Sequence, residues 1–309
     1  MPEYSERFLR SGALRIHFRD WGDPALPPLV LVHGLRDHSH SFDDIARGLL
    51  DRYHVLALDL RGHGDSETTP YYAFGHFVLD LHNLVRALRL QRPILVGHSM
   101  GGELVVRLAG SFPDVASKLV MIEGLGPPPR DLETERKWTI DGFARIDRAL
   151  AGHPGLKDLD AAYDRLRTRN PRLTEHKARE LALLGTRARE DGTLEWKFDA
   201  MLTTMAVTDP FDLEFAMSFW RAVTAPTLIV HGAESGEFWR NRPGGGSSPP
   251  RTVSRHLKNG LKALLDNCTD TEVLLGDRAI TPRASSVHAA GNTSTQAGRS
   301  TRRRPARRC

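Results

Sequence analysis

The sequence of 309 residues has little cysteine and no long apolar segment. Its two cysteines, Cys268 and Cys309, both lie towards the C-terminus, so a framework of disulfides is excluded as the basis of the fold. No apolar run approaches the ~18 residues that a membrane span requires. The N-terminal "MPEYSERFLRSG" also lacks the apolar core of a signal peptide. We therefore expect a cytoplasmic protein that does not bind membranes.

Aromatic side chains are missing from residues 240–309, since the last one is Trp239. The charge balance changes at the same point: these residues contain 14 basic and 4 acidic side chains, whereas the whole chain carries only +5. Residues 278–309 have too few apolar side chains to pack, and we expect a disordered basic tail. Its basic run "RSTRRRPARR" is terminal and holds no aromatic residue, so no nucleic-acid partner is expected.

Before this tail, buried strand patterns alternate with helical patterns, which is typical of an α/β protein with a mainly parallel sheet. An early strand over 13–22 is expected to be antiparallel. Residues 131–222 are charged and helical without clear strands, and Thr174 is a plausible helix N-cap. The resulting division has four parts: the first part of an α/β core over 1–126, a helical cap over 127–222, an incomplete second part of the core over 223–277, and the tail over 278–309.

The stretch "PILVGHSMGGELVVRLAG" runs from a short apolar strand through a glycine-rich turn into a helix. Gly97, Ser99 and Gly101 match G-x-S-x-G, a pattern in which a strained turn holds a serine hydroxyl clear of the sheet. A Cβ at either glycine would crowd the neighbouring strand or helix. Ser99 is therefore the predicted nucleophile.

A second stretch, "LVHGLRDHSHSF", supplies a strand end followed by a glycine. If the chain doubles back there, the N–H of Leu35 joins that of Met100 as two donors to a developing oxyanion. We expect His33 to brace this loop rather than to transfer protons.

In chain order, "VHG", "DLRGHGDS", "GHSMGG", a helical cap and "PTLIVHG" resemble the α/β-hydrolase superfamily over about residues 13–235, with similarity to its esterase and lipase-like members. The resemblance implies a doubly covered, mainly parallel sheet and a structural role for Asp59, Arg61 and His63. Serine at the turn, where some relatives have aspartate, favours hydrolysis of an ester, thioester or lactone through an acyl-enzyme, or cleavage of a C–C bond next to a carbonyl. The expected partner is a small-molecule, ester-type substrate. Apolar cap residues such as Trp196, Phe198 and Phe215 are candidates to line the acyl pocket, although most are expected to pack the cap onto the core. No cofactor and no metal are expected.

The acid of a catalytic triad has three candidates. In the α/β-hydrolase superfamily, which this sequence resembles, the acid is usually an aspartate just after the strand that corresponds to "TLIVHG". No aspartate stands at that position here, and the carboxylates that flank it are Glu234 and Glu237. The other family position is the end of the strand after the nucleophile helix, where Glu123 stands in "VMIEGLG". We favour Glu123.

The triad histidine is harder to find, because no Gly-His pair follows Gly232. His288 is the only histidine after the expected last strand, and His256, His98 or His38 would have to be repurposed. The interpretation that we favour is that this chain lacks a functional base. A frame slip or a replaced C-terminus would explain why the histidine motif, the aromatics and the charge balance all change near residue 240. The leading hypothesis is thus a serine esterase on Ser99, and the alternative is a catalytically impaired protein of the same fold. The sequence does not indicate an oligomeric state.

Overall fold

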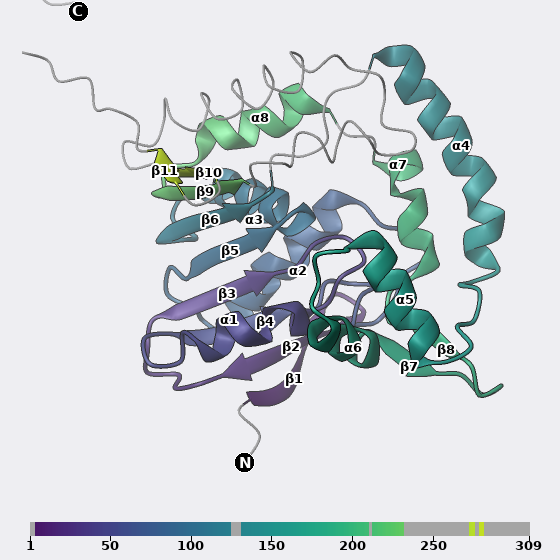
Figure 1. Cartoon of the computed structure of the whole chain (residues 1–309). Coiled ribbons are helices and arrows are strands. Elements are labelled where there is room, and N and C mark those ends of the chain that lie inside the picture. The colour runs from purple at the N-terminus through teal and green to yellow at the C-terminus, as the bar shows by residue number, and fades with distance from the viewer. Residues whose placement is uncertain (1–3, 125–130, 210–211, 232–271, 276–277, 281–309) are drawn as a thin grey trace, which may run out of the picture.

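The computed structural model describes residues 4–124, 131–209, 212–231, 272–275 and 278–280. A nine-stranded sheet forms its centre, in the order β1-β2-β4-β3-β5-β6-β9-β10-β11 (Figure 1). Neighbours are parallel from β4 to β10, and β1, β2 and β11 are antiparallel to the strands they join. The strands are β1 (Tyr4–Ser11), β2 (Leu14–Trp21), β3 (Pro28–Val32), β4 (His54–Leu58), β5 (Ile94–His98), β6 (Lys118–Ile122), β9 (Thr227–His231), β10 (Glu272–Leu275) and β11 (Arg278–Ile280).

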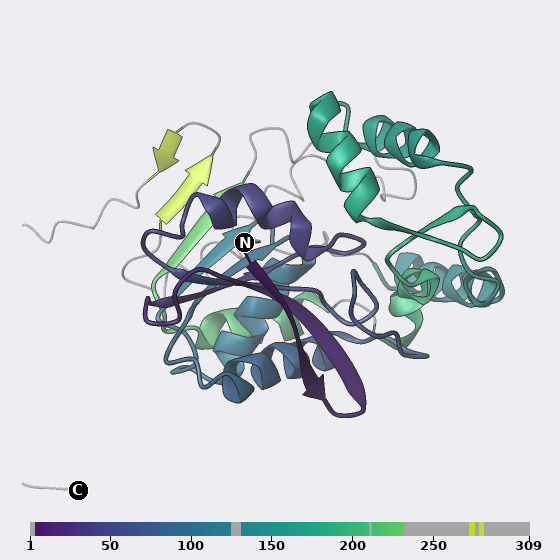
Figure 2. The ribbon, with the colours of Figure 1, turned by 90° about the horizontal axis from the view of Figure 1, so that it is seen from below.

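Helices cover both faces of the sheet, which explains why β3 and residues 55–58 of β4 are continuously apolar. Figure 2 shows α1 (Asp43–Arg47) on one side and α2 (Phe74–Ala87), α3 (Met100–Ser111) and α8 (Leu213–Ala222) on the other. The larger core cluster lies on the side of α2, α3 and α8, and the smaller one lies under α1 and the short 3-10 helix η1 (Ser39–Phe42). The fold class expected from the sequence is confirmed.

The cap lies between β6 and β9 in the chain and stands at one end of the sheet (Figure 1). It contacts the loops that follow β3 and β4: the Asp199 N–H donates to the Gly62 carbonyl, and His63 forms a β-bridge with Phe198. The cap therefore covers the carboxyl ends of these parallel strands, where open α/β sheets bind ligands. Its elements are α4 (Leu132–Leu150), α5 (Leu159–Arg169), α6 (Glu175–Leu184), β7 (Thr186–Ala188), β8 (Leu194–Trp196), η2 (Ala200–Thr204) and α7 (Met205–Thr208).

Several expected elements are confirmed, and three need correction. Thr174 caps α6, since its side chain accepts from the Lys177 N–H at 3.2 Å. The cap is not free of strands, because β7 and β8 form an antiparallel hairpin. β1 was not expected, since its outward residues are charged and it is defined by pairing with β2. Residues 278–280, assigned above to a disordered tail, form β11 beside β10.

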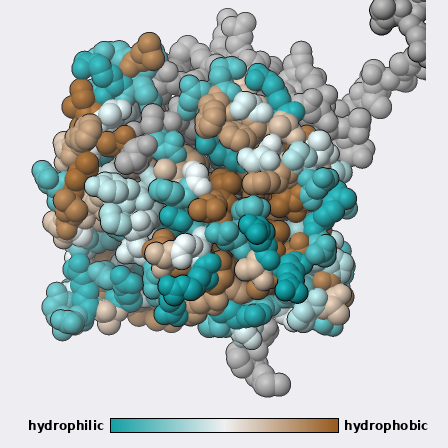
Figure 3. Space-filling model, turned by 180° about the vertical axis from the view of Figure 1, so that it is seen from behind, coloured by the Kyte–Doolittle hydropathy of each residue, from teal (hydrophilic) through white to brown (hydrophobic). Residues whose placement is uncertain are grey.

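Apolar side chains are also exposed on the cap. Figure 3 shows such side chains along the edge of the molecule on which α4 stands. On α4 they recur at helical spacing along one stripe, which consists of Leu132, Ile140, Phe143 and Leu150. Within the described residues, no helix combines the length and the apolar character that crossing a membrane requires.

Candidate active site

Ser99 stands between the end of β5 and the first turn of α3, in a conformation that serine rarely adopts. Its φ is 52° and its ψ is −118°, and holding a non-glycine residue there costs on the order of 1–3 kcal/mol. Three backbone hydrogen bonds hold it: the Ser99 N–H donates to the Ile122 carbonyl at 2.7 Å, and the Ser99 carbonyl accepts from the N–H groups of Gly102 at 3.0 Å and Glu103 at 3.4 Å. The side chain is half-buried at the start of a helix, where free N–H groups favour negative charge.

The glycines around Ser99 are required by close backbone approaches. A Cβ at Gly97 would lie 2.2 Å from the Gly101 carbonyl oxygen, and one at Gly101 would lie 2.2 Å from that of Val32. A third close approach was not foreseen: a Cβ at Gly102 would lie 2.7 Å from the Cα of Gly124. The last glycine of "GHSMGG" was the available signal for this contact. Through these contacts the backbone at the start of α3 packs directly against the ends of β3 and β6.

The loop after β3 reaches Ser99. A Cβ at Gly34 would lie 3.1 Å from the Ser99 Cβ, so the backbone that leads into Leu35 passes against the nucleophile. Leu35 itself is 42% exposed, whereas Met100 is buried. The two predicted oxyanion donors thus belong to the two segments that flank Ser99.

Glu123 follows β6 at the register position next to Ser99. His98 and Ile122 are partners in the parallel pair β5–β6, and Ser99 and Glu123 are the next residue on each strand. Glu123 is half-buried, has a φ of 57°, and donates its N–H to the Val230 carbonyl of β9 at 3.0 Å. The structure therefore brings Ser99 and Glu123 to neighbouring positions at one edge of the sheet.

Of the other candidates for the acid and the base, only His38 and His98 lie within the described residues, and His98 ends β5 with its Nδ1 3.3 Å from where a Cβ at Gly34 would lie. Glu234, Glu237, His256 and His288 lie outside the described residues. His38 is turned towards the cap, since a Cβ at Gly185 would lie 2.8 Å from its Nε2. Burial lowers its pKa. Of the hydrogen bonds that histidine side chains form in the part of the chain that the structure describes, none joins Ser99.

The residues of "DLRGHGDS" make structural contacts, as the resemblance implies. Arg61 holds Asp80 through two hydrogen bonds of 2.6 and 2.7 Å. Asp59 is fully buried and accepts from the N–H groups of Ser39 and Asp65 and from His17 Nδ1. Burial alone would raise the pKa of Asp59, but the hydrogen bond from His17 and its charge hold the pKa well below its usual range.

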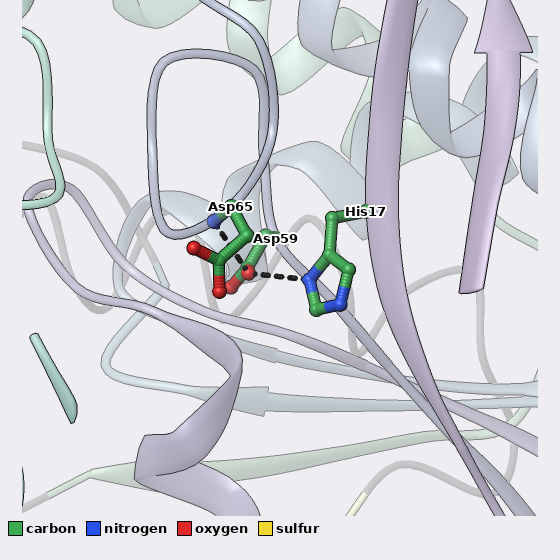
Figure 4. A group of neighbouring side chains, drawn as sticks. All are labelled: His17, Asp59 and Asp65. Carbon is green, nitrogen blue, oxygen red and sulfur yellow. Dashed lines mark hydrogen bonds and ion pairs between the residues drawn. The ribbon is translucent and has the colours of Figure 1, made fainter. Parts of the chain in front are cut away.

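His17, Asp59 and Asp65 stand close enough for a metal site, with ligand atoms within 4.8 Å of one another (Figure 4). Their hydrogen bonds favour a different interpretation. His17 binds Asp59 through Nδ1 at 2.7 Å and contacts the Glu6 carboxylate through Nε2, so both ring nitrogens are occupied. The group is a hydrogen-bonded brace between β2 and the loop after β4.

A cavity of about 170 Å³ lies between the loop after β4 and the cap hairpin. Trp196 and Phe198 line it and stack on each other with ring centroids 5.9 Å apart. His153 also lines it and binds the Phe198 carbonyl at 2.7 Å. Phe215, by contrast, lies on α8 over the guanidinium of Arg107 on α3 and thus packs against the core.

The comparisons with known proteins agree with this geometry. The sequence profile of the alpha/beta hydrolase fold matches residues 27–236. The chain is 30% identical over 226 residues to 2-(acetamidomethylene)succinate hydrolase of Mesorhizobium japonicum, covering 72% of this chain and 76% of that one. It is 38% identical over 104 residues to sn-1-specific diacylglycerol lipase ABHD11 of Mus musculus. Among solved structures, the thioesterase domain from the curacin biosynthetic pathway superposes with a TM-score of 0.71 at 23% identity, over 88% of this chain and 92% of that one.

Fold, strained serine turn and profile together define the class of the protein, which is that of the alpha/beta hydrolase fold. The chain belongs to the alpha/beta hydrolase fold family. Serine hydrolases, lipases and esterases are among its named relatives. The match spans 51% of a serine hydrolase-like protein of Danio rerio and 34% of the mouse lipase, so their activities belong to those whole proteins.

Proposed function

We propose that the protein hydrolyses carboxylic esters through an acyl-enzyme on Ser99. The observation that carries this proposal is the strained conformation of Ser99, with φ at 52°, on a strand-to-helix turn. Strain of this kind persists at functional sites, where the surrounding structure enforces it. Here the close approaches at Gly97 and Gly101 enforce it.

Charge stabilisation is assigned to two backbone groups, the N–H of Leu35 and the N–H of Met100. Attack by Ser99 on the ester carbonyl places negative charge on the carbonyl oxygen, and each donor aimed at that oxygen is worth about 3 kcal/mol. The approach of Gly34 to Ser99 supports the first donor, and the position of Met100 at the start of α3 supports the second.

Proton transfer needs a histidine base that removes the Ser99 hydroxyl proton and returns it to the leaving alcohol. Water then hydrolyses the acyl-enzyme and releases the carboxylic acid product. Glu123 is the proposed acid that orients this histidine, because it follows β6 beside Ser99. His288 remains the candidate base from the sequence. The substrate class is a small to medium, uncharged acyl ester, and relatives named as lipase and esterase support it.

A second candidate is an impaired hydrolase. Among the described residues, the hydrogen bonds of the histidine side chains join carboxylates and backbone groups, and none of them joins the Ser99 hydroxyl. The side chains of His256 and His288, and that of His231, lie outside the described residues. A serine without a base is a poor nucleophile at neutral pH.

The test is hydrolysis of p-nitrophenyl butyrate by the full-length protein and by Ser99→Ala, Glu123→Gln and His288→Ala. Ser111→Ala is the matched control, because Ser111 is an exposed serine at the other end of α3. The esterase proposal predicts loss of activity in Ser99→Ala and no change in Ser111→Ala. Labelling by a fluorophosphonate should follow the same pattern.

The two candidates then separate. Activity that depends on Ser99 and also falls in His288→Ala establishes an esterase with His288 as its base. A wild-type rate equal to that of Ser99→Ala, with no fluorophosphonate labelling, contradicts the esterase and supports the impaired protein.

A further inference from the structure

Two buried histidines hold the loop that carries Leu35. His33 and His63 are both fully buried, and their ring centroids are 5.0 Å apart. Residues 34–37 form a turn, in which the Asp37 N–H donates to the Gly34 carbonyl at 3.3 Å. One histidine binds the first residue of this turn, and the other binds its third residue.

Their partners define the protonation of both rings. His33 Nε2 accepts from the Leu60 N–H at 3.0 Å, so its proton is on Nδ1, which donates to the Gly34 carbonyl at 2.7 Å. His63 Nε2 accepts from the Arg36 N–H at 3.0 Å, so its Nδ1 donates to the Arg61 carbonyl at 2.9 Å. A backbone N–H can only donate, and both rings are therefore neutral Nδ1–H tautomers.

The bond from His33 acts on the peptide that supplies the proposed oxyanion donor. The Gly34 carbonyl and the Leu35 N–H belong to the same peptide unit, and in a planar trans peptide they point in opposite directions. Holding the carbonyl oxygen on the side of His33 therefore directs the N–H to the other side. Gly34 lies against Ser99, so a small rotation of this peptide would change the donor's aim.

The bond from His63 acts on the next residue. Arg36 has a φ of 61°, a left-handed conformation that is unfavourable for a residue other than glycine. The hydrogen bond from its N–H to His63 compensates this cost and keeps the turn closed.

We propose that His33 and His63 are positioning residues of the oxyanion site, which together fix the direction of the Leu35 N–H. This inference rests on the proposed function. Neither ring is assigned to touch the substrate, so both act through the turn of residues 34–37.

Asparagine and glutamine variants test the two positions in opposite senses. Asparagine retains a donor near Nδ1, and glutamine retains an acceptor near Nε2. At position 33 the donor matters, so we expect His33→Asn to keep most of kcat and His33→Gln to lose about 100-fold with little change in KM. At position 63 the acceptor holds Arg36, so His63→Gln should be active and His63→Asn impaired.

His54 provides the control, because it is a buried histidine at the amino end of β4 that binds Asp20 at 2.6 Å. His54→Asn and His54→Gln should have equal kcat. General loss of stability cannot produce opposite preferences at two positions. Equal kcat for the two variants at both His33 and His63, in a protein that Ser99→Ala inactivates, would overturn the inference.

A second measurement needs no turnover. In protein labelled with ¹³C′-glycine and ¹⁵N-leucine, an HNCO spectrum shows only the five Gly–Leu peptides of the chain, among them Gly34–Leu35. We expect this signal to move in His33→Gln and to stay close to its wild-type position in His33→Asn. An unmoved signal in both variants would overturn the inference. If Ser99→Ala is as active as the wild type, the proposed function fails, and this spectrum alone decides the placement of the peptide.

Discussion

His17 Nδ1 and the Asp59 carboxylate are joined by a hydrogen bond of 2.7 Å inside the protein, and the other ring nitrogen of His17 contacts Glu6. Burial lowers the pKa of His17, but the bonds to Asp59 and Glu6 outweigh it and raise the pKa to about 9. A histidine placed between two carboxylates is thus charged at neutral pH. It links β1, β2 and the loop after β4.

This pair predicts a loss of stability in alkali. Because the folded-state pKa of His17 lies above its ordinary value of 6.5, its contribution is complete below pH 6.5 and is lost as the pH rises through about 9. The difference is on the order of 3 kcal/mol. Thermal unfolding midpoints should fall over this range in the wild type and change much less in His17→Gln. Parallel curves for the two proteins would contradict the assignment.

Alanine at Gly101 should strongly destabilise the protein. Its Cβ would lie 2.2 Å from the Val32 carbonyl oxygen, a backbone atom in the centre of the sheet, so we expect a loss of about 3 kcal/mol. Gly75 in α2 is the matched control, since a Cβ there meets nothing within 4 Å. Gly75→Ala should stabilise by about 0.5 kcal/mol through helix propensity. Urea unfolding measures both variants, and equal midpoints would show that the close approach is relieved elsewhere.

The buried pair of Arg61 and Asp80 should not tolerate loss of one partner. Asp80→Asn leaves the Arg61 guanidinium without its counter-charge in the interior, at a cost of about 3–5 kcal/mol. Arg136 and Glu133 form a solvent-exposed pair on α4 and serve as the control. Arg136→Ala should leave the denaturant midpoint unchanged, because exposed pairs contribute little. A similarly small effect of Asp80→Asn would refute the argument.

Glu103 should destabilise the folded protein once its hydrogen-bond partners are removed. Burial raises its pKa, although Arg107 Nε donates to it at 2.9 Å and Trp220 Nε1 at 3.1 Å. Arg107→Met is expected to destabilise the contact of α3 with α8, and the double variant Arg107→Met/Glu103→Gln to recover part of the loss. Unfolding in denaturant measures the cycle. Additive effects of the two substitutions would mean that the pair is not coupled.

The serine turn was predictable because G-x-S-x-G between a strand and a helix has one structural meaning, and the contacts at Gly97 and Gly101 show why. The cap hairpin was predictable too, but it was missed. Asp191-Gly192 is a hairpin-turn signal, and Gly192 has a φ of 82°. Its strands have only three residues each, which is too short for a periodic pattern.

β1 could not be predicted from its own residues. Only Leu9 and Ser11 are buried in it, and its remaining described residues are half-buried or exposed, so no apolar alternation marks a strand. Pairing with β2 creates it. The clamp on the turn of residues 34–37 was likewise hidden, because it depends on which backbone groups His33 and His63 reach after folding.

Because β6 pairs directly with β9, the sheet is continuous across the point at which the cap is inserted in the chain. Leu119 to Ile122 lie in register with Thr227 to Val230, although α4 to α8 come between these strands in the chain. Of these helices, α8 packs on α3 and completes the core layer. The segment from α4 to α7 is therefore an insertion whose length and sequence can vary without changing the strand order or the serine turn.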